Sequence, residues 1–124
     1  MINAYVGGVI YDVMAQHAAN PTEATTLVSD YLPRWREGGL TGAVVQVSSW
    51  EAINYYFTEF ANDTEGQMTF CRTRADFENR PEGSFGIFFS LEGHGPLAGD
   101  FEALYTLDHI GVATFTFSHN LQNP

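Results

Sequence analysis

The sequence predicts an α/β fold built on a mainly parallel sheet, and the order of its apolar and helical segments carries that prediction. Apolar runs of strand length alternate along the chain with segments of helical spacing. Such alternation favours a parallel sheet whose strands are joined by right-handed crossovers. The 124 residues, 44% of them hydrophobic, suit a single domain over residues 1–124 with its own core.

The first part of the chain contains two predicted strands with a helical segment between them. Residues 2–10 are apolar with paired glycines, which is typical of a strand followed by a turn. Residues 20–23 (Asn-Pro-Thr-Glu) favour a helix start, because asparagine caps well and proline suits the first helical position. Pro33 is expected to break or kink this helix, since it removes a hydrogen bond, and a short piece at 34–37 ends at a glycine pair. The nearly continuous apolar run at 41–48 is typical of a strand covered on both faces.

The second part continues the alternation. The serine pair at 48–49 resembles a capping box in front of an amphipathic helix. The aromatic residues of that helix are expected to form a buried face: Trp50, Tyr55, Tyr56, Phe57 and Phe60. The remaining predicted elements are a turn at 62–66, a short strand at 68–72, a short helix at 75–79, a strand at 85–91, a helix that Asp100 caps and Gly111 ends, and a strand at 112–117. The strand at 85–91 is the most strongly predicted.

Composition excludes several classes of function. The chain has fifteen acidic residues and only five basic ones, all arginine. The resulting net charge of −10 argues against nucleic-acid backbones and anionic membranes as partners. No apolar run approaches the ~20 residues of a membrane span, and no basic segment leads into an apolar one at the N-terminus, so a cytoplasmic location is expected. Cys71 is the only cysteine, which excludes an intrachain disulfide, and it is expected to be a buried spectator. His17 and His109 are isolated, and packing is their expected role.

Two strands lead directly into polar side chains that can do chemistry. Glu92 follows the strand at 85–91, and His119 follows the strand at 112–117. Because the carboxyl ends of parallel strands meet at one end of the sheet, both side chains should face the same mouth. A carboxylate there can bind metals or act as a base, and a histidine can bind metal or donate a proton. From position alone, the glutamate can equally cap the next helix and the histidine can tie down a loop.

Four segments together match the motifs of one known family. Residues 90–94, SLEGH, resemble an EGGH-type motif with one glycine fewer, and residues 107–120, LDHIGVATFTFSHN, are similar to an LGVRYLTLTHN segment. Residues 32–49 resemble the stretch that precedes and forms the second strand, and residues 72–76 resemble the segment before the glutamate strand. In these motifs and their order, the chain resembles the N-terminal half of the membrane (renal) dipeptidase family of zinc metallopeptidases.

The resemblance implies a fold, a cofactor and roles for three residues. It implies the front half of a (β/α)8 TIM-like barrel with a binuclear zinc site that hydrolyses dipeptides. The motif glutamate of the family bridges the two zinc ions, which implies a metal-binding role for Glu92. The histidine of the THN-type motif contacts the substrate and stabilises the tetrahedral intermediate, which implies a catalytic and substrate-binding role for His119. Asn120 is implied to bind substrate beside it.

Two departures from the family bear on metal binding. The family opens with D-x-H-x-D on its first strand, and here Tyr5 and Gly7 stand where the histidine and the second aspartate bind metal. The two remaining histidine ligands come from the second half of the barrel, outside these residues. Catalytic zinc sites need about three protein ligands. On these residues alone, the zinc site is therefore expected to be incomplete or absent.

A half-barrel is expected to need a partner. Its open strand edges invite pairing, and an inner face of large apolar side chains would be unstable in water. We expect a second polypeptide that supplies the other half-barrel, or self-association. Two identical copies would still lack the missing histidines.

Three functions remain open at this point. The first is a subunit or segment of a membrane-dipeptidase-like metallohydrolase acting on dipeptides or related small amides, with a small peptide-like substrate and a site completed by another chain. The alternative is a non-catalytic dipeptidase-like protein that has lost its metal site. A small-molecule-binding module in the same cleft has only the aromatic content in its favour.

Overall fold

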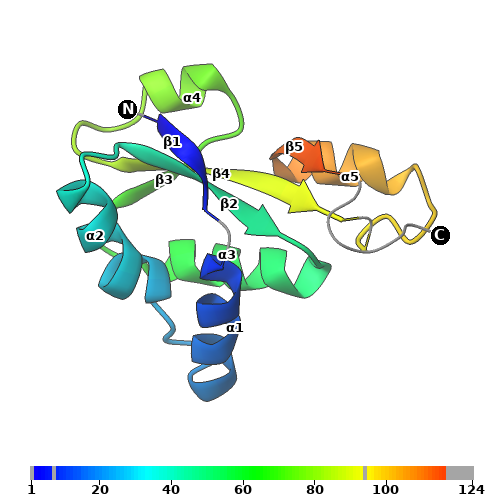
Figure 1. The fold of residues 1–124 in the computed structure, drawn as a ribbon, viewed down its shortest axis with the longest axis horizontal. Coiled ribbons are helices and arrows are strands. Elements are labelled where there is room, and N and C mark those ends of the chain that lie inside the picture. Colours follow the sequence, from blue (N-terminus) through cyan, green and yellow to red (C-terminus); the bar gives the residue numbers. More distant parts are fainter. Residues whose placement is uncertain (1, 7, 94, 117–124) are drawn as a thin grey trace.

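The computed structural model describes the backbone of residues 2–6, 8–93 and 95–116, and side chains from residue 8 onward. Its strands are β1 (Ile2–Val6), β2 (Gly42–Val47), β3 (Met68–Phe70), β4 (Phe85–Glu92) and β5 (Val112–Thr116). Its helices are α1 (Val9–Ala19), the π-helix η1 (Leu27–Tyr31), α2 (Leu32–Glu37), α3 (Trp50–Asn62), α4 (Arg74–Glu78) and α5 (Ala103–Ile110). All the strand pairs are parallel, so the predicted α/β class is confirmed, and the sheet is open (Figure 1).

Strand β4 is the centre of the sheet. It pairs with β2 along six registered residue pairs, from Gly42↔Gly86 to Val47↔Leu91. On its other edge, β3 pairs with the first part of β4 and β5 with the last part. The long strands therefore follow the order β1-β2-β4-β5, and the short β3 lies end to end with β5.

The outer face of the sheet carries the hydrophobic core. Helices α1, α2 and α3 lie together on this side in Figure 1. Alternate residues of β2 and β4 point toward them and are almost completely buried: Ala43, Val45, Val47, Ile87, Phe89 and Leu91. The ring centroid of Phe89 lies 5.4 Å from that of Tyr56 in α3 and 4.6 Å from that of Phe70 in β3. Burial of these side chains holds the helical layer on the sheet.

The inner face is sealed at its N-terminal end by one side chain. Phe77, from α4 on the opposite side of the sheet from α1 and α3 (Figure 1), lies over two facing glycines. A Cβ atom added to Gly42 would lie 2.7 Å from Cε2 of Phe77, and one added to Gly86 would lie 2.6 Å from it. The ring of Phe77 is also 5.9 Å from that of Phe88. The two glycines therefore form a slot that this ring fills.

The expectation of an apolar, exposed inner face is wrong for the described residues. Their exposed large hydrophobic side chains belong to helices or to the turn before α5: Tyr11, Met14, Trp50, Phe57, Phe101 and Tyr105. The inward positions of β2 and β4 hold glycine, polar residues and the half-buried Val44 and Phe88. Trp50 and Phe57 also correct the expected aromatic face of α3, of which Tyr56 is fully buried.

The first helix differs from the sequence-based expectation. A strand and turn were predicted over residues 2–10, but α1 begins at Val9, and Asn20 ends this helix instead of starting the next. Gly8 caps α1 with a φ of 90° and no side-chain hydrogen bond, so the usual capping signal is missing. No break occurs at Pro33, because the π-helix η1 ends at Tyr31 and α2 follows it directly, with the proline in the first turn of α2.

A buried acid ties the outer helices together. Glu59 of α3 is fully buried, and its Oε2 accepts a hydrogen bond from the backbone N–H of Leu27, the first residue of η1, at 2.9 Å. The other carboxylate oxygen lies 3.3 Å from Nε2 of His17 in α1, which is also buried. The expected packing role of His17 is therefore confirmed, with Glu59 as its polar neighbour.

The slot for Phe77 can be tested by filling it. We expect Gly86→Ala to lower the free energy of unfolding by about 1–3 kcal/mol, the usual cost of overpacking. In a Phe77→Ala background the same substitution should cost less, because the clashing ring is gone. Urea denaturation of the four proteins of this cycle gives both values.

Gly38→Ala is the matched control, since the nearest atoms to its Cβ would be 3.5 Å away. It should change stability by no more than about 0.5 kcal/mol. An equal cost of Gly86→Ala in both backgrounds would contradict the packing of Phe77.

Candidate functional site

Polar side chains gather on the inner face at the C-terminal ends of the strands. Register places Gln46 of β2 beside Ser90 of β4, Ser90 beside Thr114 of β5, and Glu92 beside Thr116. Because side chains alternate along a strand, these five residues share the face on which Phe77 lies. We call them the polar ladder. The hydroxyl of Thr114 donates to Oγ of Ser90 at 2.7 Å, which joins β4 and β5 just below Glu92.

A bulge in β5 is needed to build this ladder. The register between β4 and β5 shifts after the pair Phe89↔Val112, so that Ser90 pairs with Thr114. Val112 consequently joins the hydrophobic core, whereas Thr114 and Thr116 follow the inner face. Strict alternation along the strand would place Val112 on the same face as the two threonines, and the bulge explains why it lies on the other face.

The loop after β4 partly covers the mouth of the sheet. Its first residue, Gly93, donates its N–H to the carbonyl of Thr116 at 2.7 Å and has a φ of 82°. Further along, a Cβ on Gly95 would lie 3.1 Å from the carbonyl oxygen of Ser48, at the end of β2. The loop therefore crosses from β4 to the end of β2, and Glu92 is half-buried at its base.

One of the three predicted site residues lies within the described structure. Glu92 lies at the C-terminal end of the central strand, on the polar inner face, as its position after a strand suggested. His119 and Asn120 lie outside the described residues, as do Gly7 and the side chain of Tyr5. The convergence of Glu92 and His119 therefore stays a prediction.

The described part of the chain does not by itself fit a zinc site. Within residues 8–93 and 95–116, no three histidine, cysteine, aspartate or glutamate side chains are grouped so that they could hold a metal ion. Glu92 is accompanied in the polar ladder by hydroxyl and amide groups, which are not the nitrogen, sulfur and carboxylate ligands that zinc prefers. Any zinc at Glu92 needs ligands from elsewhere.

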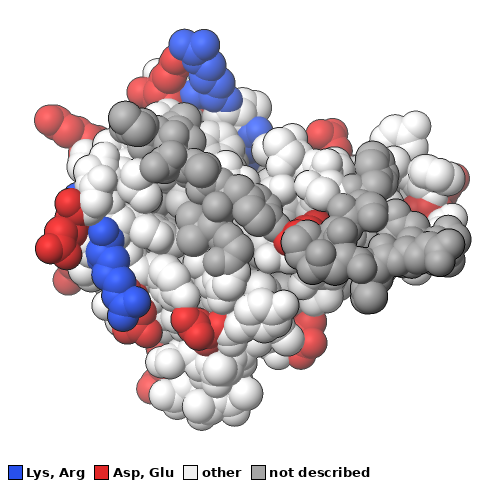
Figure 2. All heavy atoms as spheres, viewed as in Figure 1, with Lys and Arg blue, Asp and Glu red and all other residues white. Residues whose placement is uncertain are grey.

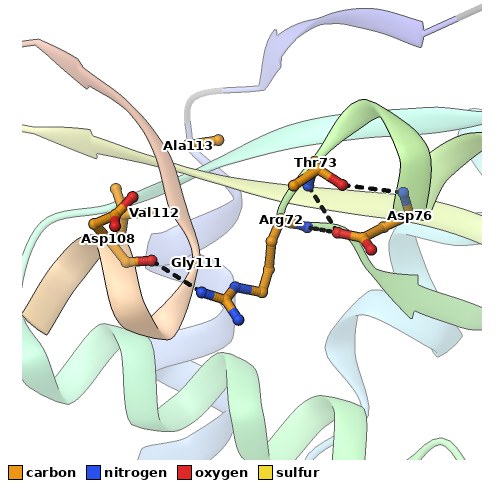
Figure 3. A pocket seen from close by; sticks show the side chains of 7 residues that line it. All are labelled: Arg72, Thr73, Asp76, Asp108, Gly111, Val112 and Ala113. Atoms are coloured by element: carbon orange, nitrogen blue, oxygen red, sulfur yellow. Dashed lines mark hydrogen bonds between the residues drawn. The ribbon is translucent and has the colours of Figure 1, made fainter.

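A polar cavity lies where β3 ends and β5 begins (Figure 3). It has a volume of about 440 Å³ and is lined by Arg72, Thr73, Asp76, Asp108, Gly111, Val112 and Ala113. Arg72 reaches across it, and its Nη2 donates to the carbonyl of Asp108 at 3.3 Å. The cavity borders the start of β5, whereas Glu92 pairs with the last residue of β5. It is therefore separate from the polar ladder.

The carboxylate in this cavity caps a helix. Asp76 accepts hydrogen bonds from the backbone N–H groups of Arg72 at 2.9 Å and Thr73 at 2.8 Å, and Thr73 in turn caps α4. These bonds hold the pKa of Asp76 below its usual value. The Thr73-x-x-Asp76 spacing is a capping box, a signal that the sequence analysis did not use. Cys71, the residue before Arg72, is fully buried as expected, and this burial raises the pKa of its thiol.

Charge on the face in Figure 2 is dispersed. Acidic side chains are scattered over it, and the basic side chains form separate spots without a continuous stripe. In the part of the chain that the structure describes, no helix is long and apolar enough to cross a membrane.

Comparison with known proteins finds likeness in structure only. No protein-family profile and no curated protein matches the sequence. An amidohydrolase from Pseudomonas aeruginosa superimposes on 73% of the chain with a TM-score of 0.62 and 22% identity. The probable dipeptidase PvdM from the same organism covers 90% of the chain (TM-score 0.61, 21% identity), and dipeptidase AC, a metallopeptidase of family M19, covers 92% (TM-score 0.63, 18% identity).

These matches establish the fold. The chain spans 30%, 38% and 41% of the length of the three proteins, so it corresponds to part of a larger, barrel-like α/β structure. At this level of identity, what the neighbours do bears on this chain only as a proposal.

The role of Asp76 predicts a pH dependence of stability. Its folded-state pKa is lowered, so its contribution is fully present above the unfolded value of about 3.9 and is lost as the pH falls through the folded value. Asp76→Ala should therefore be less stable than the parent at pH 7, and the deficit should shrink below about pH 4. Thermal unfolding of both proteins between pH 3 and pH 7 measures this difference in stability.

Glu78→Ala, on the same helix and in an exposed ion pair with Arg74, is the control and should change little. A deficit for Asp76→Ala that does not vary with pH would contradict the capping role of the carboxylate.

Proposed function

We propose that the chain is a subunit or segment of a dipeptidase-like metallohydrolase, whose active site is completed by polypeptide outside these 124 residues. The observation that carries the proposal is the place of Glu92. It ends the central strand of an open parallel sheet, faces a polar surface, and belongs to a fold shared with proteins described as dipeptidases and an amidohydrolase. Active sites of barrel enzymes lie at this end of the strands.

Each candidate residue has a distinct role in this proposal. Glu92 is a metal ligand, held in place by the β4–β5 pairing and by the hydroxyl bond between Thr114 and Ser90 beneath it. His119 acts in catalysis and contacts the substrate, and Asn120 binds the substrate beside it. The remaining metal ligands come from the completing polypeptide, because the described residues do not supply them.

The polar ladder suits a small substrate of the proposed class. A dipeptide or related small amide carries several hydrogen-bond donors and acceptors, and buried ones need partners in a site. Gln46, Thr116 and the Ser90–Thr114 pair offer such groups next to Glu92. An apolar inner face would have offered none.

A second candidate function has a specific observation in its favour. Tyr5 and Gly7 stand where the family has metal ligands, and glycine has no side chain with which to bind. The alternative is therefore a non-catalytic dipeptidase-like protein that keeps the fold and has lost the metal.

Metal content and activity together separate the two functions. We expect the isolated chain to bind no pair of zinc ions, and its complex with the completing polypeptide to hold zinc and hydrolyse dipeptides. Glu92→Gln should lower kcat/KM in the complex by more than about 100-fold, because losing even an outer-shell partner of a metal costs roughly 10–100-fold. His119→Ala should lower kcat with zinc still bound.

Elemental analysis and hydrolysis of a dipeptide series are the measurements, and Glu23→Gln, at an exposed turn, is the matched control. A complex that contains no zinc and cleaves no dipeptide would favour the non-catalytic alternative. Two zinc ions bound by the isolated chain would contradict the assignment of its ligands.

A further inference from the structure

A second cavity lies at the opposite end of the sheet from Glu92. It has a volume of about 350 Å³ and opens beside the residues that precede β2 and β4. Two arginines, Arg36 at the end of α2 and Arg80 after α4, line it together with the loop residues Gly39, Gly83 and Ser84. These are two of only five basic residues in a chain with fifteen acidic ones.

Both guanidinium groups are held in position by neutral acceptors. Nη2 of Arg36 donates to the carbonyls of Gln67 and Gly83, at 3.2 Å each. Nε of Arg80 donates to the carbonyl of Ser84 at 2.7 Å, and its Nη1 to the carbonyl of Phe77 at 2.6 Å. The guanidinium carbon of Arg80 also lies 3.8 Å from the ring centroid of Phe77. The two groups are therefore ordered without any ligand.

Neither positive charge has a carboxylate partner within the described structure. The ion pairs found there join His17 to Glu59 and Arg74 to Glu78, and none of these four residues lines this cavity. In the described residues, no carboxylate lies within 4.0 Å of the guanidinium group of Arg36 or Arg80, so neither positive charge is neutralised by a direct ion pair.

We infer that this cavity binds the phosphate group of a small molecule. Guanidinium groups donate charge-assisted hydrogen bonds to phosphate oxygens, and two positive charges balance the roughly −1.5 to −2 charge of a phosphate monoester better than the single charge of a carboxylate. The volume of about 350 Å³ falls in the usual range of small-ligand sites, roughly 300–1,000 Å³. It leaves room for an organic group beyond the phosphate.

The backbone around the cavity leaves it accessible. Gly39 and Gly83 both have positive φ, at 78° and 79°, and a Cβ on either would meet no atom within 4 Å. The loops that carry them thus present bare backbone next to the arginines. Binding would cost little conformational entropy in the side chains of Arg36 and Arg80, because hydrogen bonds to carbonyl groups already hold both of them.

Titration of the ¹⁵N-labelled protein with inorganic phosphate and with glycerol 3-phosphate tests the inference. We expect saturable shifts of the Nε–H signals of Arg36 and Arg80 and of the amides of Gly83 and Ser84. Acetate at equal ionic strength should cause none. A tighter apparent Kd for glycerol 3-phosphate than for inorganic phosphate identifies a phosphomonoester as the ligand, and the reverse order identifies free phosphate.

Arg36→Gln should weaken the apparent Kd by about tenfold or more, as expected for losing a charge-assisted contact. Arg74→Gln, which removes the same charge at an exposed site outside the cavity, should leave it unchanged. Shifts that do not saturate, or an equal loss in both variants, would overturn the inference. The signals mapped in the parent protein decide the matter even if Arg36→Gln is unstable.

Discussion

The structure depends on one strand that is paired along both of its edges. β4 contacts β2 over its length, and β3 and β5 share its other edge. Its outward residues, such as Phe89, hold the helical layer, and its inward residues change along the strand from Gly86 through Phe88 to Ser90 and Glu92. The core lies on one face of this strand, and the end covered by Phe77 and the candidate site follow each other on its other face. A change in its register by one residue would exchange the two faces and lose all three.

The inward sequence of β4 also explains how an open sheet avoids an exposed apolar face. At the N-terminal end, Phe77 covers the glycine slot and is itself covered by Arg80. At the C-terminal end, the inner face carries the hydroxyl, amide and carboxylate groups of the polar ladder in place of apolar side chains. The two edges of the sheet are open: in the described structure, β1 pairs only with β2, and β5 only with β4. One backbone edge of each of these strands has no partner strand there. Open edges of this kind favour pairing with further strands.

Local signals in the sequence predicted much of the fold. The strands at 85–91 and 41–48 were found from their apolar runs, and the cap of α3 was found as a serine, although Ser49 bonds the N–H of Ala52 instead of forming a full capping box. The start of α1 was missed because Gly8 gives no capping signal. The contact of Phe77 with two glycines could not be predicted, since it depends on the pairing of β2 with β4, which brings Gly42 beside Gly86. For the site, a polar residue after a strand sufficed to find Glu92, but the Ser90–Thr114 pair depends on a bulge that no pattern indicated.

Association is the property that tests the half-barrel account most directly. Sedimentation velocity of the isolated 124 residues at micromolar concentration measures it, with 13.8 kDa as the mass of a monomer. The account predicts species larger than the monomer, or loss of native structure on dilution, and a folded complex when the completing polypeptide is added. A soluble monomer with native circular dichroism, unchanged by that polypeptide, would contradict it and show that the open sheet is a self-sufficient fold.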